Sequence, residues 1–107
     1  MLVLMMLAMA APNPHSLDAP RKAYSACIKE FEKKSVAAKM DPAAYSAVLK
    51  NVCTVEAADL TRALTNFDVA MGTKRASAAA TAASDVADYR LTSEERFHDL
   101  LLAAKGN

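Results

Sequence analysis

Apolar residues recur every three to four positions through most of this chain, which is the pattern of amphipathic α-helices. The first helix is predicted to begin between Ser16 and Asp18 and to end at Lys39 or Met40. Its charged residues, with Glu32 among them, are predicted to form a solvated face. The apolar stripe of this helix consists of Leu17, Tyr24, Cys27, Ile28, Phe31 and Ala38.

The second helix is predicted to begin at Pro42 and to run without a break to Met71. Asp41 is a good N-cap, and Pro42 behind it suits the first helical position and stops the preceding helix. Val48, Val52 and Val55 form a second apolar row in its first half, which a later helix is expected to cover. The main stripe consists of Tyr45, Leu49, Cys53, Leu60, Leu64, Phe67 and Met71.

Two further helices are expected after Gly72. The first, from Thr73 to about Tyr89, would pack through Ala76, Ala79, Ala80, Ala83, Val86 and Ala87. The second would begin at Thr92, because Thr92 and Glu95 fit a capping box. It would pack through Phe97, Leu100, Leu101 and Ala104 and end at Gly106. Whether Gly72 makes a turn or a kink in one very long helix is left open, since glycine within a helix costs only about 1 kcal/mol.

The two cysteines lie at nearly equal distances on either side of Asp41-Pro42. Folding the first two helices back on each other there would place Cys27 beside Cys53. The sequence therefore predicts an all-α fold, a small antiparallel bundle of three to four helices, with the first hairpin held by a Cys27–Cys53 disulfide. A buried pair of free thiols in a cytosolic protein is the alternative.

The apolar run at residues 1–10, MLVLMMLAMA, has the small residues Ala8 and Ala10 at its end. This is typical of a cleaved signal peptide, although no Lys or Arg precedes the run. Residues 11–16 are expected to form an extended arm that contains prolines, and residues 17–107 the helical domain. With the paired cysteines this predicts a periplasmic or secreted protein. A buried N-terminal helix is the alternative for the first segment, and a start codon further upstream is another open point.

The charge of the chain mainly serves to exclude classes of partner. The chain carries 13 Lys and Arg against 12 Asp and Glu, a net charge of +1, and only two Gly, four Pro and no Trp. Because the positive and negative charges are nearly equal in number, the chain favours neither nucleic acid nor an anionic membrane as a partner. The first ten residues are too few for a membrane span, which needs about 20 apolar residues. The expected partner is an unidentified protein or a second copy of the chain.

Glu56 is the residue that departs most from the helical pattern, because it lies on the main stripe one turn from Cys53 and from Leu60. A carboxylate there needs a partner or a wet groove, since an isolated buried charge is costly. An ion pair with Arg62 or with a lysine of the first helix, or simple exposure at the edge of the stripe, is the structural interpretation. The functional one is a ligand site at Glu56 with Tyr24, Tyr45 or Arg62 nearby.

No other constellation points to chemistry. His15, His98, Asp85 and Asp88 lack the spacing of a metal site, so no metal or cofactor is expected. The motifs of hydrolases, phosphate-binding loops, zinc proteases and haem attachment are missing. The sequence therefore predicts a non-enzymatic interaction or structural protein, with a small-ligand or metal carrier as the alternative. A membrane-active peptide is disfavoured by the near-neutral charge.

Overall fold

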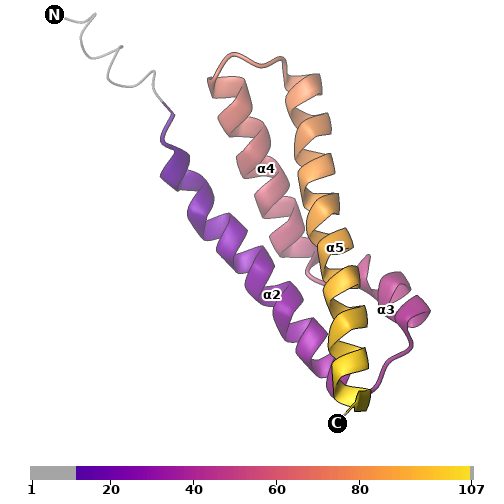
Figure 1. Ribbon diagram of the computed structural model, residues 1–107. Coiled ribbons are helices and arrows are strands. Elements are labelled where there is room, and N and C mark those ends of the chain that lie inside the picture. Colours follow the sequence, from indigo (N-terminus) through magenta and orange to yellow (C-terminus); the bar gives the residue numbers. More distant parts are fainter. Residues whose placement is uncertain (1–11, 107) are drawn as a thin grey trace, which may run out of the picture.

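The structure is a computed structural model, and it describes residues 12–106. Within this range α2 and α5 run in the same direction and α4 runs in the opposite direction, while the short α3 is drawn to the right of α5, as Figure 1 shows. The all-α bundle predicted from the sequence is confirmed. The elements are the 3-10 helix η1 (Pro14–Leu17) and the α-helices α2 (Asp18–Ala37), α3 (Pro42–Leu49), α4 (Thr54–Ala70) and α5 (Arg75–Gly106).

The expected signal peptide at residues 1–10 lies outside the described residues. Part of the expected extended arm is instead the 3-10 helix η1, because Asn13 caps it by accepting a hydrogen bond from the backbone N–H of His15 at 3.0 Å. Leu17 at its end is buried and anchors the start of α2 in the core.

The turn between α2 and α3 confirms the interpretation of Asp41 and Pro42. The Asp41 carboxylate accepts hydrogen bonds from the N–H groups of Ala43 and Ala44, and Pro42 is the first helical residue. On the other side, Lys39 adopts a left-handed conformation with φ of 54°. The N–H of Met40 then reaches back to the carbonyl of Ser35 at 3.0 Å, which closes α2 in a Schellman motif.

The continuous second helix predicted from Pro42 to Met71 is wrong. The chain leaves helical geometry after Leu49, and Cys53 adopts a left-handed conformation with φ of 57° before α4 begins. No glycine or proline marks this break, and the apolar periodicity continues across it, so the sequence pattern predicts one unbroken helix. The break lets α3 and α4 pack on different neighbours, and Figure 1 shows α3 beside the C-terminal half of α5 while α4 lies along its N-terminal half.

Gly72 forms a true turn. Its φ is 104°, and the N–H groups of Gly72 and Thr73 donate to the carbonyls of Val69 and Asp68 at 3.0 and 2.9 Å. This is the same Schellman arrangement that ends α2, here with the residue type best suited to it.

The separate helices predicted around Thr92 are wrong as well, because α5 is one helix of 32 residues. Thr92 lies inside it, so the expected capping box is not formed. Glu94 instead accepts a hydrogen bond from the Ser46 hydroxyl of α3. One continuous buried row, spaced by four or seven residues, explains the continuity; it consists of Ala82, Val86, Ser93, Phe97 and Leu101.

The predicted alanine face is only partly correct. Val86 is buried, but Ala76, Ala79, Ala80 and Ala83 are exposed, and the alanines that enter the core are Ala78 and Ala82. The valine row is not covered as predicted either, because it is split by the break. Val48 and Val55 remain exposed, and only Val52 packs against the core.

Aromatic contacts mark two levels of the core. Tyr24 of α2 contacts Tyr89 of α5 with ring centroids 5.4 Å apart. Further toward the C-terminus of α5, the Tyr45 ring stacks on Phe97 at 4.0 Å and on Phe31 at 5.2 Å. None of the described helices combines the length and the apolar character needed to cross a bilayer.

Candidate functional site

The most distinctive polar feature of the described chain is Glu32, a carboxylate that is only 3% exposed. It lies on α2 four residues after Ile28 and eight after Tyr24, so it continues their buried row. The solvated position predicted for Glu32 is therefore wrong. A buried carboxylate needs partners for both oxygens, and the structure provides them from α5.

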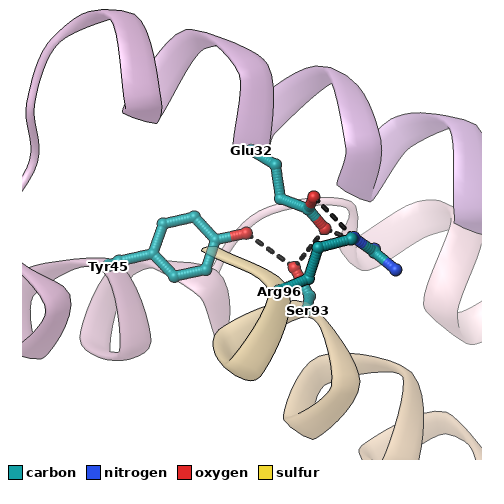
Figure 2. Close-up of polar contacts among 4 residues, drawn as sticks. All are labelled: Glu32, Tyr45, Ser93 and Arg96. Atoms are coloured by element: carbon teal, nitrogen blue, oxygen red, sulfur yellow. Dashed lines mark hydrogen bonds and ion pairs between the residues drawn. The ribbon is translucent and has the colours of Figure 1, made fainter. Parts of the chain in front are cut away.

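Arg96 and Ser93 of α5 satisfy this carboxylate, as Figure 2 shows. The Nε of Arg96 donates to Glu32 Oε1 at 2.7 Å, and its Nη2 donates to Oε2, so the ion pair is bidentate. The Ser93 hydroxyl donates to Oε2 at 2.7 Å. Because the single hydroxyl proton of Ser93 is used there, the phenol of Tyr45 donates to Ser93 Oγ, at 2.6 Å.

These four residues, the Glu32 cluster, join α2, α3 and α5 at one level of the core. Burial raises the pKa of the Tyr45 phenol above its ordinary value, and the hydrogen bond with Ser93 offsets part of that rise. The hydrogen bond to Glu32 raises the pKa of the Arg96 guanidinium. Tyr45 is therefore neutral and Arg96 charged at neutral pH, which is the state the geometry of the cluster requires.

The Glu32 cluster presents few polar groups that a substrate could contact. Ser93 and Tyr45 are fully buried, and both carboxylate oxygens of Glu32 already accept hydrogen bonds. No histidine among the described residues is hydrogen-bonded to Ser93, so nothing there activates its hydroxyl as a nucleophile. The Glu32 cluster fixes how the three helices pack.

The predicted disulfide is present, with the Cα atoms of Cys27 and Cys53 6.0 Å apart. It joins the middle of α2 to the N-cap residue of α4, so it lies at the break and not within a continuous helix. Glu56, in the first turn of α4, is half-buried beside it. The ion pair that is one structural interpretation of Glu56 is absent from residues 12–106, where its carboxylate forms neither a salt bridge nor a hydrogen bond. Its partial exposure agrees with the other, a position at the edge of the stripe.

The other three residues proposed for a site with Glu56 are engaged elsewhere. Arg62 pairs with Asp59 at 3.1 Å, exposed on both sides. The Tyr24 hydroxyl accepts a hydrogen bond from Arg90 at 3.3 Å. Tyr45 belongs to the Glu32 cluster. Within the described chain, no hydrogen bond or ion pair joins any of them to Glu56, so a ligand site of these four residues stays a prediction.

A hollow of about 300 Å³ opens beside the disulfide and does not include Glu56; its walls are Cys27, Glu30, Phe31, Lys34, Val52 and Cys53. A second hollow, of about 310 Å³, is lined by Arg21, Leu64, Asp85, Asp88 and Tyr89. Asp85 and Asp88 thus share this hollow with Arg21, although no ion pair within residues 12–106 joins Arg21 to either of them.

Sequence reasoning missed Glu32, Ser93 and Arg96. A signal was present for the first two, because each occupies a buried row at a spacing of four from an apolar neighbour, Ile28 and Phe97. A polar residue at such a position predicts a buried partner, by the same reasoning that applies to Glu56. Nothing in the sequence pairs the two rows.

Comparison with protein-family models, with curated proteins and with solved structures finds no significant match to this chain. The class that the fold defines is therefore a small disulfide-linked helical bundle, and its function has to be argued from its own surfaces.

Proposed function

We propose that this chain is a small exported protein without enzymatic activity, which acts by associating with itself or with another protein. The observation that carries the proposal is an apolar row on the outside of α5. Ala80, Ala83, Ala87 and Leu91 follow one another at spacings of three and four, and Leu91 is 57% exposed. This row is offset from the buried row of the same helix by about a third of a turn.

Small side chains let another helix approach closely, and a leucine at the end of the row adds buried area to such a contact. In the Glu32 cluster, by contrast, the two hydroxyls and the carboxylate are buried and only the Arg96 side chain reaches solvent, so the cluster presents no accessible nucleophile or base. The disulfide is compatible with an oxidising compartment, which supports export to the periplasm or the medium. Fractionation of cells that express the full chain tests export, and a product found only in the cytosol with free thiols would reject it.

Association is tested by sedimentation velocity of the oxidised protein over a concentration series, with two neighbouring variants. Ala83→Glu places a charge within the row, whereas Thr81→Glu places it at an exposed position about 200° around the helix from Ala83, outside the row. Self-association predicts that only Ala83→Glu shifts the protein toward monomer, because a desolvated charge opposes the contact.

If the wild-type chain sediments as a monomer throughout, a photo-crosslinking residue at position 83 or 81 tests for another partner in the source cells. A protein adduct specific to position 83 supports the proposal. A monomer without such an adduct rejects it.

The second candidate function is a small-ligand or metal carrier with its site near Glu56. The half-buried carboxylate, which has no partner among residues 12–106, favours it. Native mass spectrometry of the protein purified from its own periplasm should then show bound mass that Glu56→Gln loses. Protein without any added mass would count against a carrier.

A further inference from the structure

Beside the disulfide, the structure brings together three groups that bind metal ions once they are deprotonated. One ligand atom from each of Cys27, Cys53 and Glu56 lies within 4.8 Å of the other two, and all three residues are half-buried. We propose that, when the disulfide is reduced, these residues bind one divalent metal ion of the Zn²⁺ type within a single chain. The proposal narrows the carrier function to one redox state and does not depend on association through α5.

The spacing of the backbone suits such a site. A tetrahedral zinc ion with Zn–S bonds of about 2.3 Å holds two sulfurs about 3.8 Å apart. Cysteines whose Cα atoms are 6.0 Å apart reach this sulfur spacing by rotation of their side chains alone. The Glu56 carboxylate, already within 4.8 Å, needs to move by about 1 Å to reach bonding distance, which its flexible side chain allows.

Glu56 is free to act as the third ligand, because it forms no hydrogen bond or ion pair with any described residue. Its position also suits a negatively charged site. Cys53 is the N-cap of α4 and Glu56 lies in its first turn, where the unpaired N–H groups and the helix dipole favour thiolate and carboxylate. Since all three residues are only half-buried, water can supply the fourth ligand of an open zinc site.

Reduction and metal binding require only a dithiol reductant and the metal ion. A dithiol reductant gives two electrons and two protons to the Cys27–Cys53 disulfide and is itself oxidised to a disulfide. Cys27 and Cys53 each gain one electron and one proton and become thiols. Binding of Zn²⁺ then releases both thiol protons to solvent as two Zn–S bonds form. While the two sulfurs are bonded to each other, they are not available as thiolates, so the disulfide and the metal site exclude each other.

The test uses the full chain, reduced with a phosphine and freed of oxygen, and titrated with Co²⁺ as the spectroscopic probe. A 1:1 complex should show thiolate-to-cobalt charge transfer and tetrahedral d–d bands, and Zn²⁺ should displace the cobalt. The oxidised chain should show neither. Glu56→Gln, which keeps both cysteines, should weaken binding by about tenfold or more, the scale seen when groups around a metal are removed.

Glu30→Gln is the matched control, because Glu30 lines the hollow beside the same two cysteines but pairs with Lys34 at 3.9 Å. It should bind cobalt as the wild type does. A second readout covers loss of fold on reduction: zinc should raise the melting temperature of the reduced wild type and of Glu30→Gln, since only the folded chain forms the site.

Three results would overturn the proposal. The first is that the reduced wild type with Co²⁺ gives no charge-transfer band. The second is that Glu56→Gln binds Co²⁺ as tightly as the wild type, and the third is that the complex contains two chains for each metal ion. None of these bears on association of the oxidised chain, which sedimentation measures separately.

Discussion

Replacement of Arg96 by methionine isolates the contribution of the Glu32 cluster to stability. The Glu32 side chain is 4% exposed, and Arg96 supplies two of its three hydrogen bonds. Breaking a fully buried pair costs about 3–5 kcal/mol. Because the Arg96 side chain is 39% exposed, water can partly replace it, and we expect a loss of about 2–4 kcal/mol in the free energy of unfolding. For a domain of this size this corresponds to about 10–25 °C in melting temperature.

Urea unfolding at pH 7, followed by circular dichroism, measures this loss. The control is Arg62→Met, which removes an equally charged partner from the exposed pair with Asp59 and should cost less than about 0.5 kcal/mol. The double variant Glu32→Met/Arg96→Met should be more stable than Arg96→Met alone, because it leaves no unpaired buried carboxylate. If Arg96→Met and Arg62→Met cost the same, Glu32 is solvated and the cluster does not hold the helices together.

Three further outcomes follow from the backbone, the core and the disulfide. Gly72→Ala should destabilise by about 1–2 kcal/mol, since φ is 104° there, whereas Lys39→Gly should stabilise by about 0.5–1 kcal/mol at the equivalent left-handed position; equal signs in urea unfolding would refute this comparison. The raised pKa of Tyr45 means that the folded state keeps its proton above pH 10 while the unfolded state releases it, so stability falls as pH rises there. Unfolding measured between pH 9 and pH 11 should show a shallower fall in Tyr45→Phe, and parallel curves would contradict the assignment. Reduction of Cys27–Cys53 should cost about 3.5 kcal/mol on the chain-entropy model, and an unchanged urea midpoint after reduction would show that the closed loop contributes nothing.

The turn at Asp41-Pro42 and the disulfide could be predicted because each depends on local chemistry, whereas the sequence left open whether Gly72 makes a turn or a kink. Asp41 and Pro42 carry the cap and the fixed φ of a helix start, and Gly72 supplies the positive φ of a helix end. Once Asp41-Pro42 reverses the chain, the position of Cys27 opposite Cys53 follows from their spacing.

The break before Cys53 and the continuity of α5 could not be predicted because tertiary packing decides both. At Cys53 a residue without special backbone freedom takes a left-handed conformation where the disulfide ties it to α2. At Thr92 a favourable cap is left unused, because Ser93 and Phe97 continue the buried row of the same helix. Local sequence signals indicate which conformations a segment can adopt, and the packing of neighbouring helices determines which of them it does adopt.

The Glu32 cluster was hidden for a related reason. The spacing of four from Ile28 makes Glu32 a candidate for burial, but several other charged residues lie on the same helix, and the packing of α2 on α5 decides which of them is buried. Its partners lie 61 and 64 residues away along the chain, so no local window contains them. The candidate site near Glu56 was found more easily, since Cys53 and Glu56 are neighbours on one helical turn.

The uninterrupted α5, about 48 Å long, connects two regions that differ in how firmly they are held. In its first half the buried residues are Ala78, Ala82 and Val86, whose small side chains bury little area, whereas further along Phe97, Leu101 and the Glu32 cluster attach it to α2 and α3. Amide protons early in α5 should therefore exchange with solvent faster than those around Phe97, although one hydrogen-bonded helix contains both. The loosely held end carries the exposed alanine row, so a partner that docks there would find the part of the helix best able to adjust to it.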